Sequence, residues 1–151
     1  MSLFFKFALI DHVLYGLLAI ACFYVAWLWV LKQKPPVSSL RKVTFAGFIL
    51  FVLSWLAGGD YYLHYYGQFV KPVIKAGQYS WAHTVGMETK EHIFLFLPFL
   101  ALSVFATIWF AGERLETNPA LKRALTYVTG LVMVLGTAIA VIGMIISGAV
   151  R

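Results

Sequence analysis

The chain has 151 residues, of which 62% are hydrophobic and only 12% are charged. Soluble domains carry about 25% charged and about 45–50% apolar residues, so this composition excludes an ordinary soluble domain and predicts a membrane protein. The length leaves room for one compact bundle without a separate soluble domain. The net charge of +6 comes from basic residues that flank the apolar runs. They form no continuous stripe, which excludes a nucleic-acid binding face.

The first two apolar runs are long enough to cross a membrane. A spanning helix needs about 20 predominantly apolar residues, and the runs over about 8–31 and 43–66 meet that length. The first run is followed by Pro35 and Pro36, and two successive prolines cannot continue a helix. We therefore expect two membrane helices joined by a short loop.

Two further spans follow, over about 88–111 and 119–148. The last begins with Asn118 as the expected N-cap and Pro119 in the first turn. Because short loops join the first pair and the last pair of helices, neighbours should be antiparallel. The sequence predicts an all-α integral membrane protein, a four-helix transmembrane bundle of up-down-up-down topology that forms one domain over residues 1–151.

The connection between the second and third spans, residues 68–90, is rich in aromatic and basic residues. It contains Phe69, Tyr79 and Trp81 among three lysines. Tryptophan and tyrosine favour the membrane–water interface, which predicts an interfacial loop. The same loop would also serve as a lid that holds His83 above the ends of the helices, because loops on a rigid scaffold often carry function.

The distribution of basic residues predicts the orientation in the membrane. Seven Lys and Arg residues lie in or beside the two short loops, and five lie on the opposite side. The positive-inside rule then places the short loops in the cytoplasm and both termini outside. We expect the chain to lie in the inner (cytoplasmic) membrane of a bacterium or archaeon, surrounded by lipid.

All four histidines and four of the six acidic residues fall at the end of the predicted bundle opposite the short loops. Ionisable side chains at membrane depth are costly and therefore mark candidate functional sites. None of the other polar residues forms a comparable group. The eight members of this cluster are Asp11, His12, Asp60, His64, His83, Glu88, Glu91 and His92.

Spacing within the cluster favours a metal site. Asp60 and His64 are four residues apart, as are Glu88 and His92, and residues four apart share one face of a helix. A mixture of imidazole and carboxylate suits Cu, Fe, Zn or Mn, whereas an iron–sulfur cluster would need thiolates and the chain has one cysteine. The predicted metal ligands are His12, Asp60, His64, His83, Glu88 and His92, with Asp11 and Glu91 behind them as orienting partners.

Three functions are compatible with this cluster. The favoured one is a membrane metalloprotein for redox chemistry or metal handling, because a free ion uses both the imidazoles and the carboxylates. The second is a cytochrome with haem b between two of His12, His64 and His92 that exchanges electrons with quinone. The third is a non-catalytic subunit of a larger membrane complex. No hydrolase or nucleotide-binding motif is present, so no catalytic residue is assigned.

The fourth span, residues 119–148, is rich in glycine, alanine and serine. Small residues allow membrane helices to approach closely. This span is therefore expected to pack tightly within the bundle, or against another subunit in a homo-oligomer or a larger complex.

Overall fold

The computed structural model describes residues 2–149, and these residues form helices and short connections without a strand. Four helical stretches are long and apolar enough to cross a membrane. They are Leu3–Leu31, Val37–Ala76, Ala82–Arg114 and Pro119–Gly148. The prediction of an all-helical chain with four candidate membrane spans is confirmed, and it supports an integral membrane protein.

The first two helices are α1 (Leu3–Leu31) and α2 (Val37–Tyr61). Helix α1 begins five residues before the expected start at 8, because its first turns are also apolar apart from Lys6. Helix α2 begins directly after Pro36, where the backbone is no longer constrained by the proline pair. Both helices therefore extend the apolar runs that predicted them.

The connection between α2 and α4 is mostly helical, which differs from the interfacial loop expected for residues 68–90. A π-helix, η1 (Tyr62–Val70), continues α2, and the short helix α3 (Lys71–Ala76) follows it. After a turn at 77–80, a second π-helix, η2 (Ala82–Met87), leads into α4 (Glu88–Ala111). The physical reason is burial, since this segment forms a small core with Tyr66, Ile74 and Ala82 at its centre.

The last spanning helix is α5 (Pro119–Gly148), which follows a short 3₁₀ turn, η3 (Gly112–Arg114). The Asn118 side chain accepts a hydrogen bond from the Leu121 backbone N–H at 2.9 Å. The predicted N-cap with proline in the first turn is thereby confirmed.

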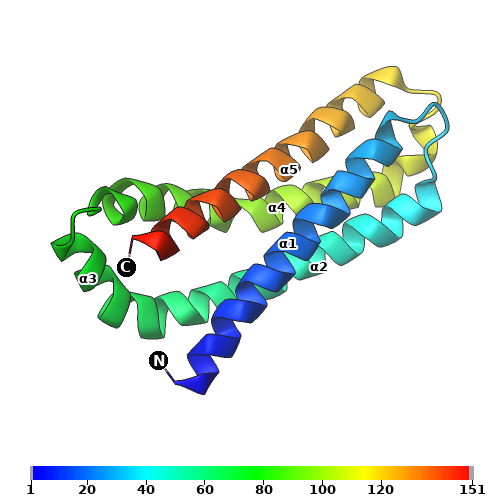
Figure 1. Cartoon of the computed structure of the whole chain (residues 1–151). Helices are drawn as coiled ribbons and strands as arrows, with labels where there is room; N and C mark the ends of the chain where they lie inside the picture. Colours follow the sequence, from blue (N-terminus) through cyan, green and yellow to red (C-terminus); the bar gives the residue numbers. More distant parts are fainter. Residues whose placement is uncertain (1, 150–151) are drawn as a thin grey trace.

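The four long helices pack as a ring in which α1 contacts α2 and α5, and α4 contacts α2 and α5. Figure 1 shows both termini and α3 at one end of the bundle and the two short connections at the other. The central core contains Phe23, Leu97, Ile108 and Val132, all fully buried. Large apolar side chains such as Phe110, which is 83% exposed, face outward, as expected of a surface covered by lipid.

Helix α5 uses its glycines inside the bundle. A methyl group added at Gly136 would lie 2.9 Å from the Ile20 side chain of α1, and one added at Gly130 would lie 3.1 Å from Trp27 of the same helix. These contacts are tighter than ordinary van der Waals packing, so the glycines permit the close approach of α5 to α1. The small residues of α5 therefore contribute to packing within one chain.

Candidate functional site

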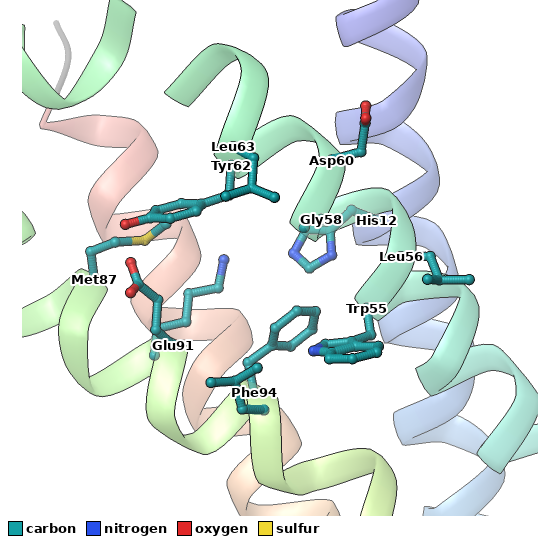
Figure 2. A pocket seen from close by; sticks show the side chains of 13 residues that line it. His12, Trp55, Leu56, Gly58, Asp60, Tyr62, Leu63, Met87, Glu91 and Phe94 are labelled. Carbon is teal, nitrogen blue, oxygen red and sulfur yellow. The ribbon is translucent and has the colours of Figure 1, made fainter. Parts of the chain in front are cut away.

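A cavity of about 460 Å³ lies between α1, α2 and α4 at the end of the bundle that carries the predicted cluster. Its walls are mainly apolar and aromatic, with a few polar groups among them, which is the usual character of a small-molecule site. Figure 2 shows the side chains that surround it. They are His12, Trp55, Leu56, Gly58, Gly59, Asp60, Tyr62, Leu63, Met87, Lys90, Glu91, Phe94 and Leu95.

His12 projects from α1 and is fixed against α2. Its Nδ1 lies 2.9 Å from the Ser54 carbonyl oxygen, and the Ser54 hydroxyl donates to the His12 carbonyl oxygen at 2.8 Å. Because the carbonyl can only accept, Nδ1 carries the proton and Nε2 keeps a free lone pair. The ring of Phe94 meets the imidazole edge to face, with centroids 5.2 Å apart. The orientation of His12 is therefore determined by three helices.

Glycine at position 58 makes this arrangement possible. A methyl group added at Gly58 would lie 2.5 Å from His12 Nδ1, whereas one added at Gly59 would meet no atom within 4 Å. The imidazole thus rests directly on the backbone of α2. Figure 2 shows the ring beneath Gly58, pointing into the space bounded by Tyr62, Glu91 and Phe94.

Two buried carboxylate oxygens at this cavity have no hydrogen-bond partner among residues 2–149. They are Oδ2 of Asp60 and Oε1 of Glu91. Leaving a buried acceptor unsatisfied costs about 1–3 kcal/mol, and more when the group is charged, so such atoms point to a missing cation or proton donor. In Figure 2 the Glu91 carboxylate extends toward Tyr62 on the far side of the cavity from His12, and the Asp60 carboxylate points away from the His12 ring.

His64 and His92 lie at the surface, each hydrogen-bonded to its own helix. His64 Nδ1 is 3.0 Å from Asp60 Oδ1 and 3.1 Å from the Asp60 carbonyl oxygen. His92 Nδ1 is 2.7 Å from the carbonyl oxygen of Glu88, and both residues are exposed. The first i,i+4 pair therefore joins imidazole to carboxylate, while the second contact uses the backbone instead of the Glu88 side chain.

His83 occupies a different environment, in the small core formed by the connection between α2 and α4. It is 2% exposed, and a hydrogen bond of 3.1 Å joins its Nδ1 to the Tyr66 hydroxyl. This bond links η2 to η1 across the turn. His83 consequently helps to hold the connection together, and it does not line the cavity.

The structure brings together only part of the predicted cluster. His12, Asp60 and Glu91 line the cavity, while His64, Glu88 and His92 are exposed and His83 is buried elsewhere. Asp11 is partly exposed and is not among the residues that line the cavity. Within residues 2–149, no three His, Cys, Asp or Glu side chains already converge on a point that would hold a metal ion.

Tyr62 and Lys90 are cavity residues that the sequence did not assign to the metal site. Lys90 carries a signal that was available in the sequence, since a basic residue within a membrane span is costly and usually has a role. Tyr62 carries no such signal, because tyrosine is common near membrane interfaces. Both residues add hydrogen-bonding groups to a wall that already contains His12, Asp60 and Glu91.

Comparisons with known proteins give no further guide to the site. Neither a scan against protein-family models nor searches of curated proteins and solved structures found a match.

Proposed function

We propose that this chain is a membrane metalloprotein that binds a transition-metal ion (Cu, Fe, Zn or Mn) in the cavity beside His12. The observation that carries the proposal is the hydrogen bond from His12 Nδ1 to the Ser54 carbonyl, which leaves Nε2 free in a cavity where Asp60 Oδ2 and Glu91 Oε1 are buried without a hydrogen-bond partner among residues 2–149. Histidine ligands of metals almost always donate their other ring N–H to a carbonyl or carboxylate in this way.

The ligand set would be His12 with the carboxylates of Glu91 and Asp60. Zn, Fe and Mn accept imidazole nitrogen and carboxylate oxygen as ligands, so one imidazole and two carboxylates suit these ions. Since these groups are not gathered in the metal-free chain, loading requires Glu91 to turn toward His12, and Asp60 to leave its contact with His64. A bound ion would supply redox chemistry, or the chain would hold the ion for transfer.

A haem b protein is the second candidate, favoured by the size and walls of the cavity. A volume of about 460 Å³ exceeds what a bare ion needs and falls in the range of organic ligands. Trp55, Tyr62 and Phe94 would flank the ring. His12 alone would supply an axial imidazole from inside the bundle, because His64 and His92 are exposed on the surface. Such a cytochrome would exchange electrons with quinone.

Metal analysis and an absorption spectrum of the purified protein separate these candidates. Stoichiometric metal without a Soret band supports the metal-ion site. A Soret band selects haem b. The absence of both would leave the third function, a non-catalytic subunit of a larger membrane complex or of a homo-oligomer.

We also propose that the four spans cross the bilayer in alternating directions, with the short connections in the cytoplasm and both termini outside. The excess of Lys and Arg near the short connections supports this orientation. The position of both termini at one end of the bundle supports the alternating directions, and does so for either orientation. The site would then open toward the outer face of a bacterial or archaeal cytoplasmic membrane.

A further inference from the structure

A second cavity, of about 440 Å³, lies mainly between α1 and α5 and adjoins the site proposed above. The two cavities share one wall, because His12, Lys90 and Phe94 line both. The remainder of its lining is apolar or small, and includes Val13, Leu17 and Met144. The cavity is therefore mainly apolar, and Lys90 is the one charged residue among the described residues that line it.

Lys90 is the unusual feature of this wall. Lys90 belongs to α4, within the membrane span Ala82–Arg114, and its amine lies on the side of α4 that faces α5. Within residues 2–149 this amine makes no hydrogen bond and no ion pair. A methyl group added at Gly143 would lie 3.5 Å from Lys90 Nζ, which places the amine at the side of the second cavity. An unpartnered ammonium at membrane depth is costly, so a hydrogen-bond acceptor in the cavity would stabilise it.

The outer edge of the cavity faces the lipid side of the bundle. Leu17 is 53% exposed and Met144 is 66% exposed, and these residues belong to α1 and α5. A ligand would thus enter from the bilayer and not from water. Its body must be apolar, and its head must accept a hydrogen bond from Lys90.

From these features we infer that the second cavity binds a lipid-dissolved quinone, with its tail between α1 and α5 and a ring carbonyl accepting a hydrogen bond from Lys90. A fatty-acid carboxylate would also meet Lys90, but it would bring a second negative charge close to Glu91, which follows Lys90 directly in α4 and whose Oε1 has no hydrogen-bond partner among residues 2–149. Two like charges repel each other. A neutral carbonyl avoids this repulsion. The flat ring would pack beside Phe94.

The inference is tested by titrating the metal-free protein in nanodiscs with decylubiquinone and following the quenching of tryptophan fluorescence. We expect saturable binding that weakens by about tenfold in Lys90→Met, because one charge-assisted hydrogen bond is lost. Lys75→Met is the matched control, since Lys75 is exposed on α3 and lines neither cavity. Equal affinity of the two variants would overturn the inference.

A second pair of variants locates the ligand. Gly143→Leu fills the second cavity, and Gly59→Leu fills the first. We expect Gly143→Leu to lose binding and Gly59→Leu to retain it, with helical content and oligomeric state checked for both. Gly143→Ala, whose methyl group makes only ordinary contact with Lys90, should fold and show an intermediate loss. Loss in Gly59→Leu alone, or displacement of the quinone by equimolar oleate, would overturn the assignment.

Discussion

At the scale of single residues, the site depends on how His12 is held. Its Nδ1 is engaged by the Ser54 carbonyl, and its ring lies on the backbone at Gly58 and against Phe94. An imidazole fixed in this way loses little conformational entropy on binding a ligand through Nε2. In the same cavity, Asp60 and Glu91 each have one buried carboxylate oxygen without a hydrogen-bond partner among residues 2–149.

A pair of glycine substitutions tests whether the position of His12 matters. Gly58→Ala should displace the imidazole, because the added methyl group would lie 2.5 Å from Nδ1. We expect metal affinity to fall by about tenfold or more, as for other changes that disturb a ligand's support. Gly59→Ala adds the same methyl group into open space and should bind as the wild type does. Isothermal titration with Zn²⁺ measures both, and equal affinities would mean that His12 is not a ligand.

The pH dependence of metal binding follows from the chemistry of the ligands. A metal ion and a proton compete for the same lone pair of an imidazole. The ordinary pKa of a histidine side chain is about 6.5. Affinity should therefore be highest above this range and fall as the pH drops through it. Zn²⁺ titrations between pH 5.5 and 8 measure the effect. An affinity that is unchanged across this range would exclude an imidazole ligand.

At the scale of elements, apolar length predicted the four spans but not the direction in which each side chain points. Helices that are apolar on all sides carry no stripe that marks the buried face. His92 directly follows Glu91, and successive residues are rotated by about 100° on a helix. This rotation leaves Glu91 lining the cavity and His92 on the surface. The level of the cluster along the bundle was predictable, whereas its division between cavity and surface was not.

The sequence also did not predict that the connection between α2 and α4 is helical. Its π-helices and α3 depend on the burial of Ile74 beside Tyr66, Ala82 and Met87, which are contacts made only after the chain has folded. Local composition, with its aromatic residues among lysines, indicated an interfacial loop. π-Helical segments are rare and often lie at functional sites. Here η1 and η2 contribute Tyr62 and Met87 to the cavity wall.

The bond between Tyr66 and His83 should stabilise this connection. Tyr66→Phe removes the hydroxyl that lies 3.1 Å from His83 Nδ1 while preserving the ring. A buried hydrogen bond contributes about 0.5–1.5 kcal/mol, and more is lost if the remaining group is left unsatisfied. We expect a lower melting temperature, measured by circular dichroism in detergent. Tyr65→Phe is the control, because Tyr65 has no side-chain hydrogen bond in the described part of the chain. Identical melting curves would contradict a stabilising role.

At the scale of the whole molecule, the bundle has two unlike ends. The end with the short connections carries an ion pair of 3.1 Å between Arg41 and Glu113. The other end contains both cavities and the buried His83. The surface ion pair and the candidate site therefore lie at opposite ends of the same four helices.

The proposed orientation predicts that tags at the N-terminus and the C-terminus are both accessible from outside intact cells. A cysteine introduced in the connection at residues 32–36 should be labelled only after the cells are opened. The combination of a labelled loop and protected termini would reverse the orientation. Termini found on opposite faces would contradict four complete spans.

If His12 holds a metal ion at the cavity, the metal content of three purified proteins will show it. Wild type and His12→Ala are compared with His92→Ala, in which the lost imidazole is exposed and hydrogen-bonded only to its own helix. We predict stoichiometric metal in wild type and in His92→Ala. The metal content of His12→Ala should be lower, because its affinity for the metal falls by at least about tenfold. Metal retained by His12→Ala at the wild-type level would show that His12 is not a metal ligand.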